Sequence, residues 1–341
     1  IGLTTRVDRK VSDATRVEVI TDGLFTRRIL SDPELNGIGA VIFDEFHERG
    51  LNSDLGLTLA METQGVLRDE IRILIMSATL DTEKVSNVLG APVIESQGRQ
   101  YPVETRYLGR SRDRIEDRMA AAVRKALREE EGSILAFLPG AREIRRTAEL
   151  LEGLPPEVHI APLFGAMAPA EQDAAVAPSP EGLRKIVLAT DIAESALTIE
   201  GVRIVIDSGL SRVAEDAAGG LGTRLSTVTA SRASVDQRRG RAGRLAPGVC
   251  YRLWDEAATR GLMPAPVPEI LKSDLSGLVL SLAEWGERDA LRLTWMDAPP
   301  IGRLKAAQAL LRTLGALDAE GVLTPLGLEM ARLPLPPRLG A

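Results

Sequence analysis

The sequence has few of the residues that mark secreted, membrane-spanning or histidine-rich metal proteins. It contains a single cysteine, Cys250, which excludes an intramolecular disulfide and a cysteine metal cluster. Two histidines are too few for a histidine-rich metal site. No apolar run is long enough to cross a bilayer, and no signal peptide is visible. We therefore expect a cytoplasmic protein in a reducing compartment, with no membrane partner.

Aromatic residues and net positive charge are also scarce. Aromatic side chains make up 3% of the chain against 44% hydrophobic residues, so aliphatic side chains should fill the cores. A net charge of −6 gives no overall basic signature of nucleic-acid binding, although local patches can still bind. The length of 341 residues predicts two or three domains. The chain opens at Ile1 without a Met, and we expect it to be a piece of a longer protein.

Short apolar runs alternate with helical patterns, which predicts parallel sheets built from βαβ units. The first such region has expected strands at 16–20, 40–43 and 71–76, with helices at 24–30 and 54–67. We interpret it as one parallel-sheet module that ends near residue 108.

The same rhythm restarts after an arginine-rich linker at 109–114. An apolar residue at every fourth position from Ile115 to Leu127 predicts an amphipathic helix. Expected strands follow at 134–138, 185–189 and 202–206. The economical interpretation is a second parallel-sheet module.

The last third of the chain has a different pattern. Residues 213–228 contain two short segments around Gly219-Gly220, which is typical of a hairpin. Helices are expected at 271–285 and 303–314, followed by two very short strands within 317–323. A helix followed by a small β ribbon suggests a winged-helix module.

Two adjacent carboxylates, Asp44 and Glu45, follow the expected strand at 40–43, which reads as a buried strand of a parallel sheet. Ligands of open α/β sheets bind beyond the carboxyl ends of the strands. One carboxylate could hold Mg²⁺ while the other orients or deprotonates an attacking water. On its own, the pair could equally belong to a solvated acidic loop that follows a strand and has no catalytic role.

Residues 237–244, Gln-Arg-Arg-Gly-Arg-Ala-Gly-Arg, form the second signal. In a helix, Gln237, Arg241 and Arg244 would share one face. A glutamine can position water, and the guanidinium forks can bind phosphate oxygens. Glycine inside a helix costs about 1 kcal/mol relative to alanine, so Gly240 and Gly243 indicate a closely approaching surface. The alternative is a solvated basic helix face.

Three shorter motifs carry little weight individually. Thr190 could contact a nucleic-acid phosphate and Asp191 a nucleotide hydroxyl or metal-bound water, but a helix cap explains both residues more simply. The segments Ser77-Ala78-Thr79 and Thr21-Asp22-Gly23 consist of residues that are common in turns.

The order of these motifs resembles motifs II, III, V and VI of superfamily 2 helicases, at 44–47, 77–79, 190–195 and 237–244. His47 and the form of the last motif are similar to the DEAH/RHA branch. Phe46 and the ending Leu-Pro-Leu-Pro at 333–336 resemble its bacterial HrpB-type members. The resemblance covers essentially the whole chain.

The resemblance implies an α/β fold of two RecA-like parallel-sheet domains. Residues 1–108 would be the C-terminal part of the first domain, and residues 109–256 would be the second. A winged helix would span 257–331, and a helical ratchet domain would begin at 332–341. Residues 213–228 would form the strand-separating hairpin.

ATP and Mg²⁺ are the cofactors that the resemblance implies. Asp44 would bind Mg²⁺ and Glu45 would act on the lytic water. His47 would link the nucleotide site to the second module, with Ser77 and Thr79 assisting that coupling.

In the second module, Gln237 would position water, with Arg241 and Arg244 as arginine fingers. Val176 would contact the base without stacking, at a position where many relatives have an aromatic residue. Asp191 would lie at the nucleotide, and relatives often have asparagine there.

The implied partner is single-stranded nucleic acid, with RNA favoured over DNA, and the implied protein is a monomer. Thr21, Asp22 and Gly23 match the nucleic-acid-contacting motif Ib. Thr190 and Thr198 match backbone contacts of motif V. Contacts to the sugar-phosphate backbone do not by themselves distinguish the two nucleic acids.

One departure from the family is large. The phosphate loop, Gly-x-Gly-Lys-Ser/Thr, is absent because the chain contains no Gly-Lys pair. We expect that loop upstream of Ile1, and we interpret the chain as most of an ATP-dependent 3′-to-5′ helicase that is inactive alone. The alternatives are a non-enzymatic nucleic-acid-binding module and a nucleotide-dependent scaffold that remodels proteins.

Overall fold

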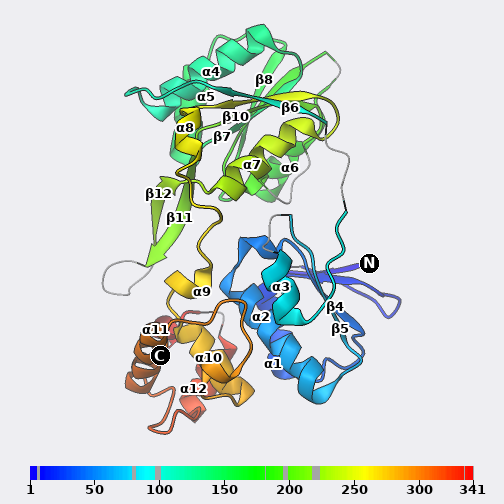
Figure 1. The fold of residues 1–341 in the computed structure, drawn as a ribbon, viewed down its shortest axis with the longest axis vertical. Coiled ribbons are helices and arrows are strands. Elements are labelled where there is room, and N and C mark those ends of the chain that lie inside the picture. The colour runs from blue at the N-terminus through cyan, green and yellow to red at the C-terminus, as the bar shows by residue number, and fades with distance from the viewer. Residues whose placement is uncertain are drawn as a thin grey trace. The chain divides into compact units, whose positions relative to one another are not determined.

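The computed structural model describes residues 1–341 except 6–7, 79–81, 97–100, 181, 195–198, 217–222, 334 and 341. The chain forms two compact units (Figure 1). Unit 1 contains residues 1–94 and 267–341, and unit 2 contains residues 95–215 and 223–266. Helices and sheets are present in both units, which confirms the expected α/β class.

Unit 2 is built on a six-stranded sheet in the order β6-β13-β10-β7-β9-β8, in which all neighbours are parallel. Its strands are β6 (Val103–Tyr107), β7 (Ser133–Phe137), β8 (Val158–Leu163), β9 (Arg184–Ala189), β10 (Val202–Asp207) and β13 (Gly248–Arg252). The strands expected at 134–138, 185–189 and 202–206 are confirmed. The sequence placed the module boundary near residue 108, but β6 is an edge strand of this sheet, so the division falls after residue 94.

Alternate residues of β7 enter two different cores, so both faces of the sheet are covered. Ile134 and Ala136 pack in one core with Met119 of helix α4 (Ile115–Glu129). Leu135 and Phe137 pack in the other core, which includes residues of helix α6 (Pro169–Val176). Of the four apolar residues that recur along α4, Met119 and Val123 are buried, while Ile115 and Leu127 at its two ends are half-buried against the same core.

The remaining elements of unit 2 lie between these strands or after them in the chain. They are helices α5 (Ala141–Leu150), α7 (Arg232–Gly240) and α8 (Glu256–Thr259), and the 3₁₀ turns Asp191–Ala193 and Arg241–Gly243. Ile144 of α5 packs in the same core as α4. Strands β11 (Leu210–Asp216) and β12 (Thr223–Thr229) form a separate two-stranded sheet, at the place of the expected hairpin. The glycine pair at its tip lies outside the described residues.

Unit 1 contains two small sheets. Strands β1 (Gly2–Thr4), β2 (Arg9–Lys10) and β3 (Glu18–Ile20) form one, and β4 (Ala40–Phe43) and β5 (Arg72–Ile75) pair in parallel as the other. Helices α1 (Asp22–Ser31), α2 (Leu51–Glu62) and α3 (Thr82–Leu89) accompany them, and α2 continues as a π-helical turn at Thr63–Leu67.

Strand β4 was expected to be buried, and that expectation is wrong for one of its faces. Val41 and Phe43 are buried, whereas Ile42 is 54% exposed and Leu74 on neighbouring β5 is 45% exposed. Since successive strand residues point to opposite faces, only one face of this two-stranded sheet packs against the core.

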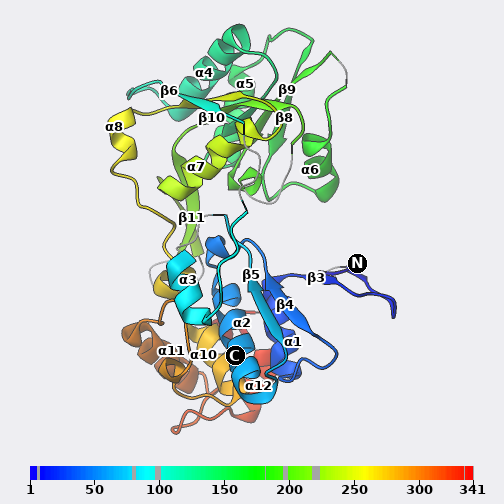
Figure 2. The ribbon, with the colours of Figure 1, turned by 45° about the vertical axis from the view of Figure 1, so that its right-hand side comes forward.

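The C-terminal part of the chain shares one hydrophobic core with α1 and α2 (Figure 2). It contains helices α9 (Glu269–Lys272), α10 (Ser276–Trp285), α11 (Ile301–Thr313), α12 (Pro325–Arg332) and α13 (Pro337–Gly340), and a 3₁₀ turn at Ala290–Arg292. The single helix expected at 271–285 is divided, because the Asp274 carboxylate accepts the Ser276 N–H at 2.6 Å and begins α10 anew. The two short strands expected within 317–323 reduce to one antiparallel bridge between Leu317 and Leu323.

No helix in the described part of the chain has both the length and the apolar character that a bilayer span requires.

Candidate functional site

The acidic pair lies immediately beyond the carboxyl end of β4. The N–H of Phe46 donates to the Met76 carbonyl at 3.1 Å, which joins the ends of β4 and β5. Glu45 has a left-handed backbone (φ 49°), and its N–H donates to Asp44 Oδ1 at 2.8 Å. A non-glycine residue in this region is uncommon and is held there by its surroundings. The tight turn presents both carboxylates at the strand end.

His47 lies beside this turn with a side chain that is 10% exposed. Its Nδ1 is 3.5 Å from Glu45 Oε2, beyond a normal hydrogen bond, and has no hydrogen-bond partner among the described residues. Phe46 is 1% exposed and packs edge-to-face on Phe43 at 6.2 Å. The aromatic residue therefore anchors the turn in the core of unit 1.

Arg49 ends the turn, and the sequence analysis did not identify it. Its backbone is also left-handed (φ 50°), and its side chain is 8% exposed. The guanidinium binds Asp54 at 3.0 and 3.2 Å and Asp297 at 2.8 Å, while its carbonyl accepts the Glu269 N–H at 3.1 Å. Asp54 is on α2, and the other two residues are in the C-terminal part of unit 1. The acidic turn is thus braced from two directions.

The glycine-containing motif in unit 2 is not one continuous helix, contrary to expectation. Helix α7 ends at Gly240, and the chain continues as the 3₁₀ turn Arg241–Gly243. A Cβ on Gly243 would lie 2.6 Å from the Tyr101 carbonyl oxygen and 2.7 Å from Val103 Cγ2. The expected close approach at Gly243 is therefore confirmed, and β6 provides the approaching surface.

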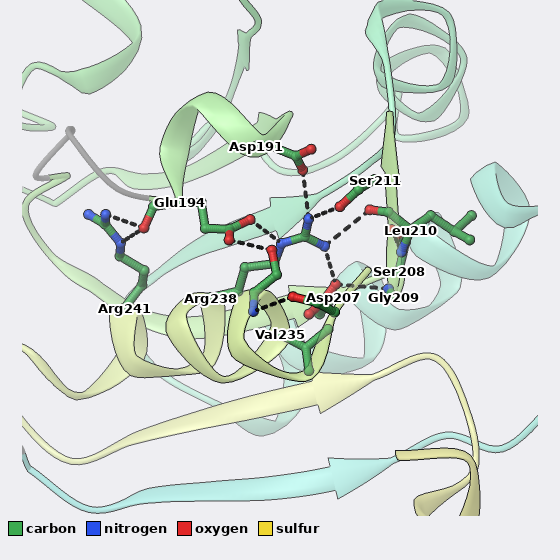
Figure 3. Close-up of polar contacts among 12 residues, drawn as sticks. Asp191, Glu194, Asp207, Ser208, Gly209, Leu210, Ser211, Val235, Arg238 and Arg241 are labelled. Atoms are coloured by element: carbon green, nitrogen blue, oxygen red, sulfur yellow. Dashed lines mark hydrogen bonds and ion pairs between the residues drawn. The ribbon is translucent and has the colours of Figure 1, made fainter. Parts of the chain in front are cut away.

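Arg238 is fully buried and lies at the centre of a polar cluster (Figure 3). Its Nε donates to Glu194 at 3.0 Å, Nη1 donates to Asp207 at 3.0 Å and to the Leu210 carbonyl at 3.1 Å, and Nη2 donates to Asp191 at 2.6 Å and to Ser211 Oγ at 2.7 Å. A guanidinium has five N–H donors, and all five are used here.

The cluster contains more negative than positive charge. Three carboxylates face one guanidinium, which lies 5.1 Å from the centre of the Phe137 ring. Partial desolvation raises the pKa of Asp191 to about 6; Arg238 opposes this shift, and Glu194 and Asp207 add to it. Oδ2 of Asp207 is buried and has no hydrogen-bond partner in the described part of the chain.

Arg241 joins this cluster from the 3₁₀ turn. Its side chain is buried, and both Nε, at 3.0 Å, and Nη2 donate to the Glu194 carbonyl oxygen. Arg244, three residues further on, is exposed. Gln237 is half-buried on α7.

The other predicted residues occupy separate positions. In unit 1, Thr21 and Asp22 are exposed at the start of α1, next to half-buried Gly23, and Ser77 is exposed beyond β5. In unit 2, Val176 is the half-buried last residue of α6, and Thr190 follows β9 with its N–H bonded to the Leu163 carbonyl. Thr79 and Thr198 lie outside the described residues.

The donor chemistry of the acidic turn suits a magnesium–phosphate site. No group of three or more potential ligands that could hold a metal ion occurs among the residues that the structure describes. Mg²⁺ usually keeps several waters and is held by one or two carboxylates together with substrate phosphates. An exposed Asp44 at a strand end fits that requirement.

Comparison with known proteins gives consistent matches. A family model described as the helicase conserved C-terminal domain matches residues 118–246, and one described as the helicase-associated winged-helix domain (HA2) matches residues 307–335. The ATP-dependent RNA helicase HrpB of Escherichia coli K12 is 47% identical over all of this chain and 42% of its own length. The pre-mRNA-splicing factor ATP-dependent RNA helicase prp22 of Schizosaccharomyces pombe is 38% identical over 99% of this chain and 30% of its own.

Solved structures agree with these matches. A crystal structure of the E. coli DEAH/RHA helicase HrpB superposes with a TM-score of 0.92 at 47% identity, covering 99% of this chain and 44% of that one. The chain thus spans about two fifths of the length of its HrpB relative. The expected RecA-like and winged-helix architecture is confirmed.

Proposed function

Because this chain belongs to the DEAH/RHA family of helicases, we propose that it takes part in Mg²⁺-dependent ATP hydrolysis coupled to 3′-to-5′ movement along single-stranded RNA. The relatives named above are ATP-dependent RNA helicases, which supports ATP and RNA over other ligands. The 3′-to-5′ direction and the use of Mg²⁺ are part of our proposal and do not come from the names of these relatives.

The observation that carries the proposal is the acidic pair, an exposed Asp44 and a half-buried Glu45, held at the end of a parallel strand by two buried anchors, Phe46 and Arg49. Asp44 would hold Mg²⁺, which would neutralise phosphate charge when bound. Glu45 would orient the attacking water and accept its proton. His47, whose Nδ1 lies 3.5 Å from Glu45 Oε2, would link the nucleotide site to the second module.

Unit 2 would supply the groups that act on the phosphates. We assign Gln237 to positioning water, and Arg241 and Arg244 to stabilising transferred charge. Val176 would contact the base. Asp191 would act near the nucleotide through its bond to Arg238, rather than as a free carboxylate.

Nucleic acid would be bound through its backbone. The exposed Thr21 and the strand-end Thr190 can donate hydrogen bonds to phosphate oxygens, and the exposed Asp22 carboxylate can accept one from a sugar hydroxyl. Gly23 and Thr198 complete the proposed set, while Ser77 and Thr79 would assist the coupling of the nucleotide site. Backbone contacts carry no sequence information directly. Little discrimination between unrelated single strands of equal length is therefore expected.

The test is Glu45→Gln in the full-length protein, assayed with saturating single-stranded RNA. Nucleotide binding should be retained while ATP turnover falls by about 10²-fold or more, the usual contribution of a general base. Glu83→Gln is the matched control, because it makes the same substitution at an exposed glutamate on α3 and should leave turnover unchanged.

The same assay separates the alternatives. A parent protein that binds RNA without hydrolysing ATP would favour a non-enzymatic binding module. Turnover that RNA does not stimulate would favour a protein-remodelling scaffold. Turnover within a few-fold of the parent in Glu45→Gln would remove Glu45 from the proposed mechanism.

A further inference from the structure

The buried Arg238 joins segments that the proposed function assigns to different tasks. Its guanidinium binds Asp191 and Glu194, in the loop between β9 and β10 that contains the proposed motif V. It also binds the Leu210 carbonyl and the Ser211 hydroxyl, at the start of β11. We propose that Arg238 is a positioning residue that couples the nucleotide-facing loop to the β11–β12 hairpin; this inference rests on the proposed function.

The geometry requires an arginine. Nε bonds the loop, Nη1 joins the end of β10 to the first residue of β11, and Nη2 joins the loop to Ser211, so one rigid group sets the relative positions of these three segments (Figure 3). A lysine has a single compact ammonium on a flexible stem and cannot span the same acceptors. A displacement of Glu194 or Asp191 is thereby transmitted to Ser211.

Glu194 also connects this cluster to a residue proposed to bind phosphate. Its carboxylate binds Arg238 and accepts the Ser234 hydroxyl, while its backbone carbonyl accepts two donors from Arg241. Any rearrangement of Arg241 toward a phosphate would break those carbonyl bonds. The contacts therefore run continuously from Arg241 through Glu194 and Arg238 to the hairpin base.

The excess of negative charge in the cluster favours movement of one of its carboxylates. One guanidinium faces three carboxylates, and Asp207 keeps one buried oxygen that has no hydrogen-bond partner among the described residues. Of the three acids, Asp191 is the one with substantial exposure, 40% of its side chain. A ligand that draws Asp191 away would relieve repulsion within the cluster, which lowers the cost of the movement.

Ser211→Ala is the decisive variant because it removes the one side-chain hydrogen bond between Arg238 and β11, leaving the bond to the Leu210 carbonyl in both the variant and the parent. Ser211 is half-buried, and the substitution leaves the ions in place. Arg238→Lys is the second variant, which keeps the charge and loses the fork. Ser111→Ala is the control, since it deletes a hydroxyl on an exposed loop of the same unit that bonds to Asp113.

The full-length protein is assayed for RNA-stimulated ATP turnover and for duplex unwinding, and the two rates are expressed as base pairs separated per ATP. In Ser211→Ala we expect turnover within about twofold of the parent and a coupling ratio lowered about tenfold or more, the effect of losing one hydrogen bond to a charged group. Ser111→Ala should match the parent. An unchanged ratio in Ser211→Ala, or turnover that falls as far as unwinding, overturns the proposal.

Hydrogen exchange in the β11 amides needs no helicase activity and separates this inference from the proposed function. If Ser211→Ala exchanges its β11 amides faster than the parent does, while exchange in β9 is unchanged, the connection between Arg238 and β11 is supported. This result does not depend on whether Arg238→Lys folds. If the parent does not unwind duplexes at all, the proposed function fails, while faster β11 exchange would still support the physical connection. If the parent unwinds duplexes and neither the ratio nor the exchange changes, the connection is refuted.

Discussion

The ion pair between Arg49 and Asp54 provides a stringent test of how the acidic turn is held. Arg49 is 8% exposed and Asp54 is 1% exposed, and two hydrogen bonds join them. Replacing Arg49 with Met keeps an unbranched, largely apolar stem but leaves the Asp54 carboxylate buried without its cation. The change is therefore expected to destabilise unit 1 through the remaining acid.

The expected magnitude follows from burial. Removing one partner of a buried pair typically costs about 3–5 kcal/mol because an uncompensated charge remains. The second partner, Asp297, adds little to this cost, since its side chain is 23% exposed and keeps Lys84 at 2.6 Å. We expect Arg49→Met to lower the free energy of unfolding of unit 1 by about 3 kcal/mol or more.

The double variant Arg49→Met/Asp54→Leu isolates the cause. Replacing both members of a buried pair with apolar groups is often neutral or stabilising, so most of the lost stability should return. The left-handed backbone of residue 49 is common to the single and double variants and cancels in the cycle.

The pH dependence has a definite sign. Burial raises the pKa of Asp54 even in the parent, with Arg49 opposing the shift, so loss of Arg49 raises the pKa further. When a carboxyl group has a higher pKa in the folded state than in the unfolded state, the free energy of unfolding of the protein falls as pH rises toward the folded-state pKa. The deficit of Arg49→Met should thus be largest near neutral pH and shrink in acid.

Urea unfolding of residues 1–341, followed by tryptophan fluorescence, measures the effect, because Trp285 and Trp295 lie in unit 1. A loss below about 1 kcal/mol at pH 7 would show that the pair is not buried as described, because the expectation for a buried pair is several-fold larger. A deficit of equal size at pH 4 and pH 7 would contradict the proposed cause.

Three other predictions address unit 2. Gly243→Ala should destabilise it by about 1–3 kcal/mol through overpacking, while Gly165→Ala, whose Cβ would have no atom within 4 Å, should be nearly neutral in a thermal melt. Arg241→Ala and Arg244→Ala should each lower ATP turnover of the full-length protein by about 10³-fold, with a smaller effect on nucleotide affinity; rates within a few-fold of the parent would exclude the arginine-finger role. Since the pKa of Asp191 is raised to about 6, the parent should lose stability as pH rises from about 4 through 6, and Asp191→Asn should flatten that dependence in melts across this range.

Much of the fold could be predicted from the sequence because its signals are local. The strands β7, β9 and β10 contain short apolar runs, at 134–137, 186–189 and 204–206, as buried parallel strands require, and α4 shows its period in four apolar positions. The turn after β4 was identified because its two carboxylates are adjacent in the chain.

Features that depend on distant contacts could not be predicted in the same way. The exposed face of β4 has the apolar composition of a buried strand, so sequence pattern could not distinguish the two faces. Helix α7 ends at Gly240 because the next turn packs against β6, more than a hundred residues earlier in the chain. The bracing of Arg49 by Asp297 has no local signal at all.

The arginines of residues 237–244 show most clearly what burial adds to a motif. The sequence singled out Arg241 and Arg244, which would share a helical face with Gln237, and assigned no role to Arg238. In the structure all five N–H groups of Arg238 already have acceptors in the chain, so binding a phosphate would require it to give up at least one carboxylate or hairpin contact. Arg241 donates to the Glu194 carbonyl, and the phosphate contact proposed for it would require an exchange of such contacts. A charged phosphate is a stronger acceptor than a neutral carbonyl, which would favour that exchange when nucleotide binds.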